Sequence, residues 1–200
     1  ARVYGYEKIP ISLPAVRPSP KAGQARGMVC LVKNALVGLG LNEVITHSLV
    51  SRQLLSDCAI SLEGLVEIRN PLSKEQEVLR PGLLASLARC VAYNLNQKQE
   101  HLGIFEIAKA FTAGSGILPK EELSLGVALC GARPLLLANG LVKDEASPLH
   151  LKGIAESLFR KLGITGYSFA PDPSGRFNVY INQDKLGAIT ALSADVLARL

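Results

Sequence analysis

Two charged residues in the stretch 70–112 have the chemistry that an active site could use. Arg80 stands in Arg80-Pro81-Gly82 at the expected start of a helix, where an arginine and free backbone N–H groups can hold an anion. Glu106 lies within an apolar strand pattern, where a buried carboxylate needs a partner such as Arg80 or a backbone N–H. A purely structural alternative stands beside each: proline often opens a helix while a neighbouring arginine pairs locally, and Glu106 could serve only to hold the core together. Arg80 and Glu106 are therefore a candidate structural polar pair as well as candidate catalytic groups.

Standard catalytic motifs are missing from the chain. There is no phosphate loop of the form GxxxxGK[ST], no GxGxxG after a strand, and neither HExxH nor GxSxG. The histidines, His47, His101 and His150, are isolated in the sequence. His47 falls within a predicted strand and is interpreted as a packing residue rather than a catalytic base.

Helices and strands on either side must position Arg80 and Glu106. Apolar periodicity and N-cap serines predict helices at 21–39, from Ser51 to about residue 59, at 82–97, at 150–162 and from Ser193 onward. Alternating and β-branched segments predict strands at 43–50, 65–69, 103–113, 123–131, 167–170, 176–181 and 185–192, with 123–131 antiparallel to 103–113. Residues 132–147 show no clear period and are predicted to be a loop. This order predicts an α+β fold, with a mostly antiparallel sheet flanked by helices.

Composition predicts one globular domain with an irregular arm. The 200 residues are 48% hydrophobic and 20% charged, enough to bury a core, which we place at residues 21–200. Residues 1–20 contain four prolines and are predicted to be an extended arm, the end of a preceding module. Because the chain starts without methionine and ends in a helix that has only begun, we interpret it as a fragment of a longer protein.

Charge, cysteine content and hydropathy narrow the function classes. The net charge of +5 and pI near 9.1 permit contact with nucleic acid, but 5% aromatic content without tryptophan disfavours a stacking platform for single-stranded RNA. Cysteines 30, 58, 90 and 130 lie in apolar runs and are predicted to be reduced core thiols rather than disulfides or zinc ligands. No apolar run approaches the roughly 18 residues of a membrane span, so we expect a soluble, cytoplasmic protein with no membrane partner.

Several segments together carry a family resemblance. They are RVYGYEKIP (2–10), EVITHSLV (43–50), NPLS (70–73), VLRP (78–81), YNLN (93–96), IFEI (104–107), LKG (151–153), LGI (162–164) and VYI (179–181). In this order and at this spacing the chain closely resembles the β chain of bacterial phenylalanine-tRNA ligase. The resemblance covers almost all of the chain and implies a class II aminoacyl-tRNA synthetase-like core domain.

The resemblance also implies that this core has no active site. Catalytic class II enzymes end the equivalent strand with an aromatic residue, arginine, any residue and glutamate, and the arginine holds the ATP α-phosphate as negative charge develops. Here these positions are Phe111, Thr112, Ala113 and Gly114. Thr112 cannot supply a fixed cation and Gly114 cannot supply a carboxylate. We therefore predict no catalytic, cofactor-binding or metal-binding residue in the chain.

The resemblance implies a role in assembly instead. In the family, the helix and strand equivalent to residues 21–49 join two α and two β subunits. The apolar stripe of that helix makes its members candidates for contact with the catalytic α chain, although a helix that covers its own sheet would show the same stripe. These candidates are Met28, Val29, Val32, Ala35, Leu36 and Leu39.

The activity that the resemblance implies belongs to the whole complex, which would attach phenylalanine to tRNA(Phe) with ATP and Mg²⁺. Two alternatives come from other classes of protein. One is an autonomous ligase or nucleotide-binding enzyme that uses Arg80 and Glu106. The other is a tRNA-binding module, which would lose affinity steeply as salt is added.

Overall fold

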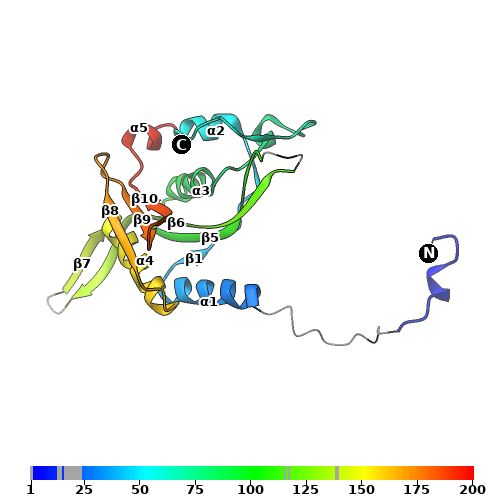
Figure 1. Ribbon diagram of the computed structural model, residues 1–200, viewed down its shortest axis with the longest axis horizontal. Coiled ribbons are helices and arrows are strands. Elements are labelled where there is room, and N and C mark those ends of the chain that lie inside the picture. Colours follow the sequence, from blue (N-terminus) through cyan, green and yellow to red (C-terminus); the bar gives the residue numbers. More distant parts are fainter. Residues whose placement is uncertain (1, 13–14, 16–23, 115, 117, 138–139) are drawn as a thin grey trace.

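The fold is built around one twisted sheet with helices on both faces (Figure 1). The computed structural model describes residues 2–12, 15, 24–114, 116, 118–137 and 140–200. Its helices are α1 (Gln24–Gly38), α2 (Arg52–Asp57), α3 (Leu84–Asn96), α4 (Pro148–Lys161) and α5 (Ala194–Leu197), with 3-10 turns η1 (Tyr6–Lys8) and η3 (Lys74–Gln76). Its strands are β1 (Asn42–Glu43), β2 (Leu49–Val50), β3 (Val66–Glu67), β4 (Val78–Leu79), β5 (His101–Thr112), β6 (Lys120–Leu137), β7 (Gly140–Glu145), β8 (Tyr167–Pro171), β9 (Phe177–Ile181) and β10 (Asp184–Ile189). The predicted α+β class is confirmed.

The central sheet has the strand order β1-β5-β6-β7. The long antiparallel pair β5 and β6, which the sequence predicts, runs from His101 opposite Gly131 to Thr112 opposite Lys120. The short strand β1 lies parallel to β5 at one edge. Beyond Gly131, β6 leaves β5 and pairs with β7 instead. Gly131 thus marks the point at which one strand changes partner.

Different helices pack on the two faces of β5. Successive side chains of a strand point to opposite faces, so neighbouring residues of β5 enter different cores. Phe105 packs with Ala35 and Leu36 of α1 and with Leu158 of α4. Ile104 packs with the α3 cluster on the other face, which contains Leu83, Leu87 and Val91. In Figure 1, α1 and α3 accordingly lie on opposite sides of the β5–β6 ribbon.

Two small sheets complete the molecule. Strands β2, β4 and β3 form one, whose residues Val50 and Val78 pack with Leu55 of α2. Strands β10, β9 and β8 form the other, which packs Val179 and Ile189 against Phe159 of α4. Both predicted serine caps are confirmed. Ser51 Oγ accepts the Leu54 N–H at 3.0 Å, and Ser193 Oγ accepts the Val196 N–H at 3.4 Å.

The loop predicted at 132–147 is wrong. Residues 132–137 continue β6, and residues 140–145 return along them as β7. The prediction failed because Leu135-Leu136-Leu137 form a continuous apolar run, which shows no alternation, and Pro134 interrupts the pattern. Asn139-Gly140 is a common hairpin dipeptide and was the available signal.

The single strand predicted at 43–50 is also wrong. Two short strands, β1 and β2, flank an irregular segment at 44–48. His47 in this segment is exposed, so it is not the packing residue that the alternation predicted.

The predicted arm and first helix fall partly outside the described residues. Residues 13–14 and 16–23, which include most of the prolines and the start of the predicted helix, are not described. Within 2–12 the chain makes only the η1 turn, and Val3 and Ile11 are fully exposed. In Figure 1 this segment lies away from the domain.

Candidate functional site

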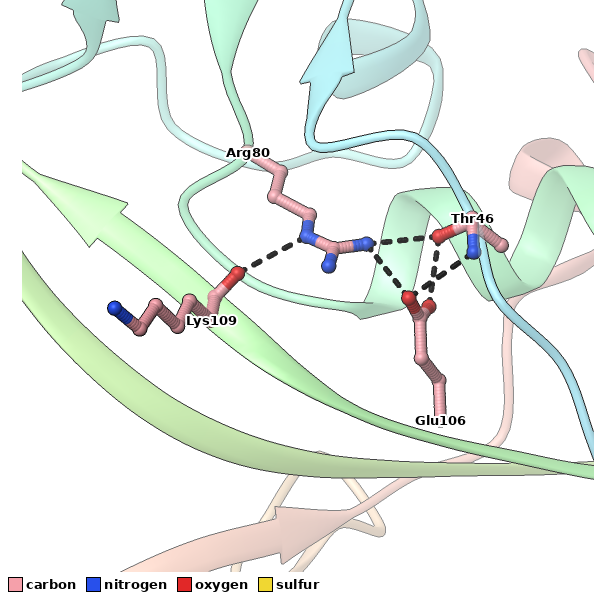
Figure 2. Close-up of polar contacts among 4 residues, drawn as sticks. All are labelled: Thr46, Arg80, Glu106 and Lys109. Atoms are coloured by element: carbon pink, nitrogen blue, oxygen red, sulfur yellow. Dashed lines mark hydrogen bonds and ion pairs between the residues drawn. The ribbon is translucent and has the colours of Figure 1, made fainter. Parts of the chain in front are cut away.

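Arg80 and Glu106 meet in the interior as a buried ion pair (Figure 2). Each is 2% exposed, and Arg80 Nη1 lies 3.0 Å from Glu106 Oε1. Thr46 joins the pair: its N–H donates to Glu106 Oε1 at 3.1 Å and its hydroxyl donates to Oε2 at 2.7 Å. Arg80 also donates to Thr46 Oγ1 at 2.8 Å and, through Nε, to the Lys109 carbonyl at 3.1 Å. Three segments far apart in the sequence are therefore joined at one point.

The polar atoms of this cluster bond mainly to one another and join parts of the fold, so few of them are free to bind a substrate. Both oxygens of Glu106 accept hydrogen bonds from the protein, as a buried carboxylate requires. The backbone of Arg80 is bonded on both sides, its N–H to the Ser48 carbonyl and its carbonyl to the Phe111 N–H, each at 2.9 Å. The geometry therefore favours the structural reading of Arg80 and Glu106 over the anion site and the nucleotide-binding enzyme.

Thr112 and Gly114, where the resemblance expects the charged residues of catalytic class II enzymes, lie at the end of β5 and just after it. Thr112 is exposed and paired with Lys120 of β6. A Cβ at Gly114 would lie 3.0 Å from the Leu118 carbonyl oxygen, a distance tighter than ordinary packing. A side chain as large as glutamate at position 114 would therefore disturb the backbone here.

Helix α3 occupies the face of the sheet to which Glu106 and Thr112 belong. A Cβ at Gly126 of β6 would lie 2.6 Å from Leu87 Cδ1 and 2.9 Å from Leu83 Cβ. The glycine thus allows α3 to lie directly on the sheet, and two leucines fill the space above it. Sequence reasoning missed this role, because a glycine in a strand shows only that something approaches closely.

The predicted interface residues of α1 divide between core and surface. Ala35 and Leu36 are 2% and 0% exposed and pack inside this chain, so they cannot touch a partner. Val29, Val32 and Leu39 are half-buried, whereas Met28 is 55% exposed. Leu31 and Val37, which the stripe did not include, are exposed as well. Between residues 27 and 38 the charged side chain of α1 is Lys33, which is 35% exposed and forms an ion pair with Glu43 of β1.

The three histidines lie in two cavities. His101 and His150 line a cavity of about 630 Å³ between α4 and the start of β5, and His47 lines a smaller one beside α3. His150 Nε2 lies 2.8 Å from Asp144 Oδ2, and its Nδ1 accepts the Ser147 N–H at 3.1 Å. Because its lone pair already accepts a backbone N–H, His150 in this arrangement holds the start of α4 and is not free to act as a base.

The cysteines agree only partly with the predicted core thiols. All four are free; Cys58 is buried, Cys90 and Cys130 are half-buried, and Cys30 is exposed on α1. Burial raises the pKa of the Cys58 thiol, and the adjacent Asp57 carboxylate raises it further, so the thiol stays protonated at neutral pH.

Neither a metal-binding cluster nor a membrane-spanning helix occurs in the described part of the chain. It contains no group of three or more histidine, cysteine, aspartate or glutamate side chains placed to hold a metal ion. None of its helices combines the length and the apolar character needed to cross a bilayer.

Two solved structures share the architecture described above. The chain superposes on the pyrrolysyl tRNA synthetase PylSc of Desulfitobacterium hafniense with a TM-score of 0.65 at 15% identity, covering 88% of this chain and 61% of the other. A second structure of pyrrolysyl-tRNA synthetase from that organism gives a TM-score of 0.60 at 16% identity, covering 80% and 56%. At this identity the likeness shows the fold alone, which is that of a class II synthetase core.

Sequence comparison shows the family. The phenylalanine–tRNA ligase beta subunit of Syntrophus aciditrophicus is 34% identical over 215 residues, which cover 100% of this chain and 26% of that protein. The beta subunit of Carboxydothermus hydrogenoformans is 31% identical, with 96% of this chain and 25% of that protein covered. The chain thus spans about a quarter of the length of these relatives. The model of the phenylalanyl tRNA synthetase beta chain CLM domain matches residues 9–200, and the chain belongs to this family.

Proposed function

We propose that this chain is a non-catalytic core domain of a phenylalanine-tRNA ligase β chain and that it supports assembly with a separate, catalytic α chain. The complex, in the cytoplasm, would attach phenylalanine to tRNA(Phe) with ATP and Mg²⁺, and the α chain would hold the reacting groups. We expect the α₂β₂ arrangement that the family resemblance implies. The observation that carries the proposal is a class II fold whose strand β5 runs into Phe111-Thr112-Ala113-Gly114, where the family resemblance expects arginine and glutamate at positions 112 and 114.

The packing above the sheet supports the absence of catalysis. An adenylate site needs an open face with fixed positive charge where the phosphate charge develops. On this chain Leu83 and Leu87 fill the space over Gly126, and Arg80, which is buried on that side, is bound to Glu106. Apolar packing and a neutralised arginine cannot stabilise a developing phosphate charge.

Phenylalanine-dependent exchange of pyrophosphate into ATP measures adenylate formation directly. The purified chain with ATP, Mg²⁺ and phenylalanine should show no exchange above the blank, because it has no cation or carboxylate at positions 112 and 114. A complex with the α chain should be active and serves as the positive control. Exchange by the chain alone, abolished by Arg80→Met without loss of folding, would overturn the proposal in favour of an autonomous enzyme.

The exposed face of α1 supports the assembly role. Met28, Leu31 and Val37 are between 41% and 56% exposed, and Lys33, the charged side chain of this part of α1, is paired with Glu43. Single exposed apolar residues are common, but three on one helix whose charged side chain is already paired are compatible with an interface. The face also borders β1, an open edge of the central sheet. The contact that we propose is therefore made by the exposed apolar residues Met28, Leu31 and Val37 and not by the buried Ala35 and Leu36.

Replacing Leu31 and Val37 with aspartate should reduce co-purification of a tagged α chain at least about tenfold, because two carboxylates would be desolvated in the interface. The chain should still fold, since both side chains are exposed. Leu186→Asp on β10 is a matched control with a similarly exposed leucine, and it should leave co-purification unchanged. Undiminished α binding by the double variant would exclude this face as the interface.

A further inference from the structure

The larger of the two cavities lies where the end of α1, the start of β5, strand β6 and helix α4 meet. Its volume of about 630 Å³ falls within the range typical of small-ligand sites. The functions proposed above do not use it. Its apolar lining consists of Leu39, Leu41, Leu102, Leu129, Leu149 and Ile154.

Gly153 lines this cavity from the middle of α4, at a position where close packing does not require a glycine. No heavy atom lies within 4 Å of the position that its Cβ would take. A glycine inside a helix is less favourable than alanine, because it loses more backbone freedom on folding. Its effect here is to keep one wall of the cavity free of a side chain.

Asp144 is the acidic residue of the cavity lining, and no lysine or arginine among the described residues lines the cavity to balance its charge. Its ion-pair partner is His150, whose Nε2 lies 2.8 Å from Asp144 Oδ2. Because the Nδ1 of His150 accepts the Ser147 N–H, this imidazole is neutral in the arrangement observed. The contact therefore orients the carboxylate without cancelling its charge, and it uses one of roughly four lone-pair sites.

These groups favour a planar cation on an apolar stem. An anion would meet the Asp144 carboxylate with no cation to offset it, whereas a guanidinium can donate two parallel hydrogen bonds to a carboxylate. Asn42, Gln99 and Ser157 add amide and hydroxyl oxygens to the lining, and these can accept further N–H groups. A guanidinium is more weakly hydrated than an ammonium, so it is the easier of the two to transfer from water. The leucines suit the short carbon chain that carries such a group.

We propose that this cavity binds a guanidinium group on a short apolar stem, with the guanidinium on Asp144 and the stem against the leucines. The group can belong to a free compound or to an arginine side chain of the α chain, since both present the same chemistry. The site is distinct from the missing adenylate site, and binding of the free group does not depend on the assembly role.

Titration of the isotope-labelled chain with n-butylguanidine, followed by NMR, tests the proposal. The backbone signals of Gly103, Gly131 and Gly153 should shift, because these residues line the cavity. The neutral compound n-butylurea has nearly the same shape and should bind at least about tenfold more weakly, because the charge-assisted hydrogen bonds to the carboxylate are lost.

Asp144→Asn removes the charge and keeps the shape of the side chain. It should weaken n-butylguanidine about tenfold and leave n-butylurea unchanged. Asp184→Asn on β10 is the matched control, since it removes an exposed carboxylate outside the cavity and should change neither affinity. No signal shift at about 20 mM n-butylguanidine, equal affinity for n-butylurea, or unchanged affinity in the Asp144→Asn variant would overturn the proposal.

Gly153→Leu separates occupation of the cavity from stability of the fold. It should raise the Tm, because leucine is a better helix former than glycine, and yet abolish the shifts that n-butylguanidine causes. Shifts that persist in this variant would place the binding elsewhere and overturn the proposal.

Co-purification of a tagged α chain distinguishes the two sources of the guanidinium. A loss of at least about tenfold in the Asp144→Asn variant identifies an arginine side chain of the α chain. Unchanged co-purification, together with binding of n-butylguanidine that depends on Asp144, identifies a free compound. The NMR titration uses no partner, so its outcome is independent of whether the chain assembles as proposed.

Discussion

Replacing Glu106 with leucine should lower the free energy of unfolding by about 3 to 5 kcal/mol. The substitution leaves the Arg80 guanidinium, 2% exposed, without its counter-ion, and it removes the acceptor of the Thr46 N–H. Thr46, in the middle of the segment 44–48, would then lose both of its hydrogen bonds to Glu106 of β5. Urea unfolding followed by circular dichroism measures the change as a lower midpoint.

Two further variants show that the loss comes from the buried pair. Glu121→Leu removes the carboxylate of the exposed Lys109–Glu121 ion pair and should cost less than about 1 kcal/mol. In the Glu106→Leu background, Arg80→Met should cost much less than it does alone, because the uncompensated charge is removed. If the losses of unfolding free energy in the Glu106→Leu and Arg80→Met single variants simply add in the double variant, the ion pair is not the unit that stabilises this region.

Replacing Gly131 with alanine should destabilise the chain by about 3 kcal/mol or more. Its φ of 76° lies in the left-handed region, which disfavours a side chain. In addition, a Cβ there would lie 1.9 Å from the Glu100 carbonyl oxygen, so the backbone before β5 would have to move. Because β6 changes partner at this residue, we expect the β7 hairpin to lose protection from hydrogen exchange first.

Gly175→Ala is the matched control for the backbone contribution. Gly175 has a φ of 78°, and no heavy atom lies within 4 Å of its Cβ position. Its substitution should cost only the conformational part, about 1 to 2 kcal/mol. A Gly131→Ala variant that is no less stable than Gly175→Ala would show that the contact with Glu100 is relieved without cost.

Much of the fold could be read from local patterns. The strand β5, its antiparallel partner and α3 were predicted because their periodicity is strong and their neighbours lie close in sequence. The caps at Ser51 and Ser193 were predicted because a cap is a local hydrogen bond. The β6–β7 hairpin was missed because its residues match no single period.

Other features could not be read from the pattern because they join distant residues. Thr46 and Glu106 are 60 positions apart, and their bonds turn what looks like one strand into an irregular segment. The stripe on α1 shows which side is apolar, whereas β5 and α4 decide how much of it is covered. The smaller cavity that His47 lines beside α3 likewise exists only after the segment 44–48 has been placed along that helix.

The sequence by itself determined the family, the α+β class and the residues at positions 112 and 114, because these depend on residue identity and local spacing. Only the tertiary structure decided that Arg80 and Glu106 neutralise each other, that Leu83 and Leu87 fill the sheet face, and which apolar residues of α1 stay exposed. The physical reason is that periodicity specifies which face of an element is apolar. Which element covers that face, and which charges meet beneath it, depends on contacts between segments far apart in the chain.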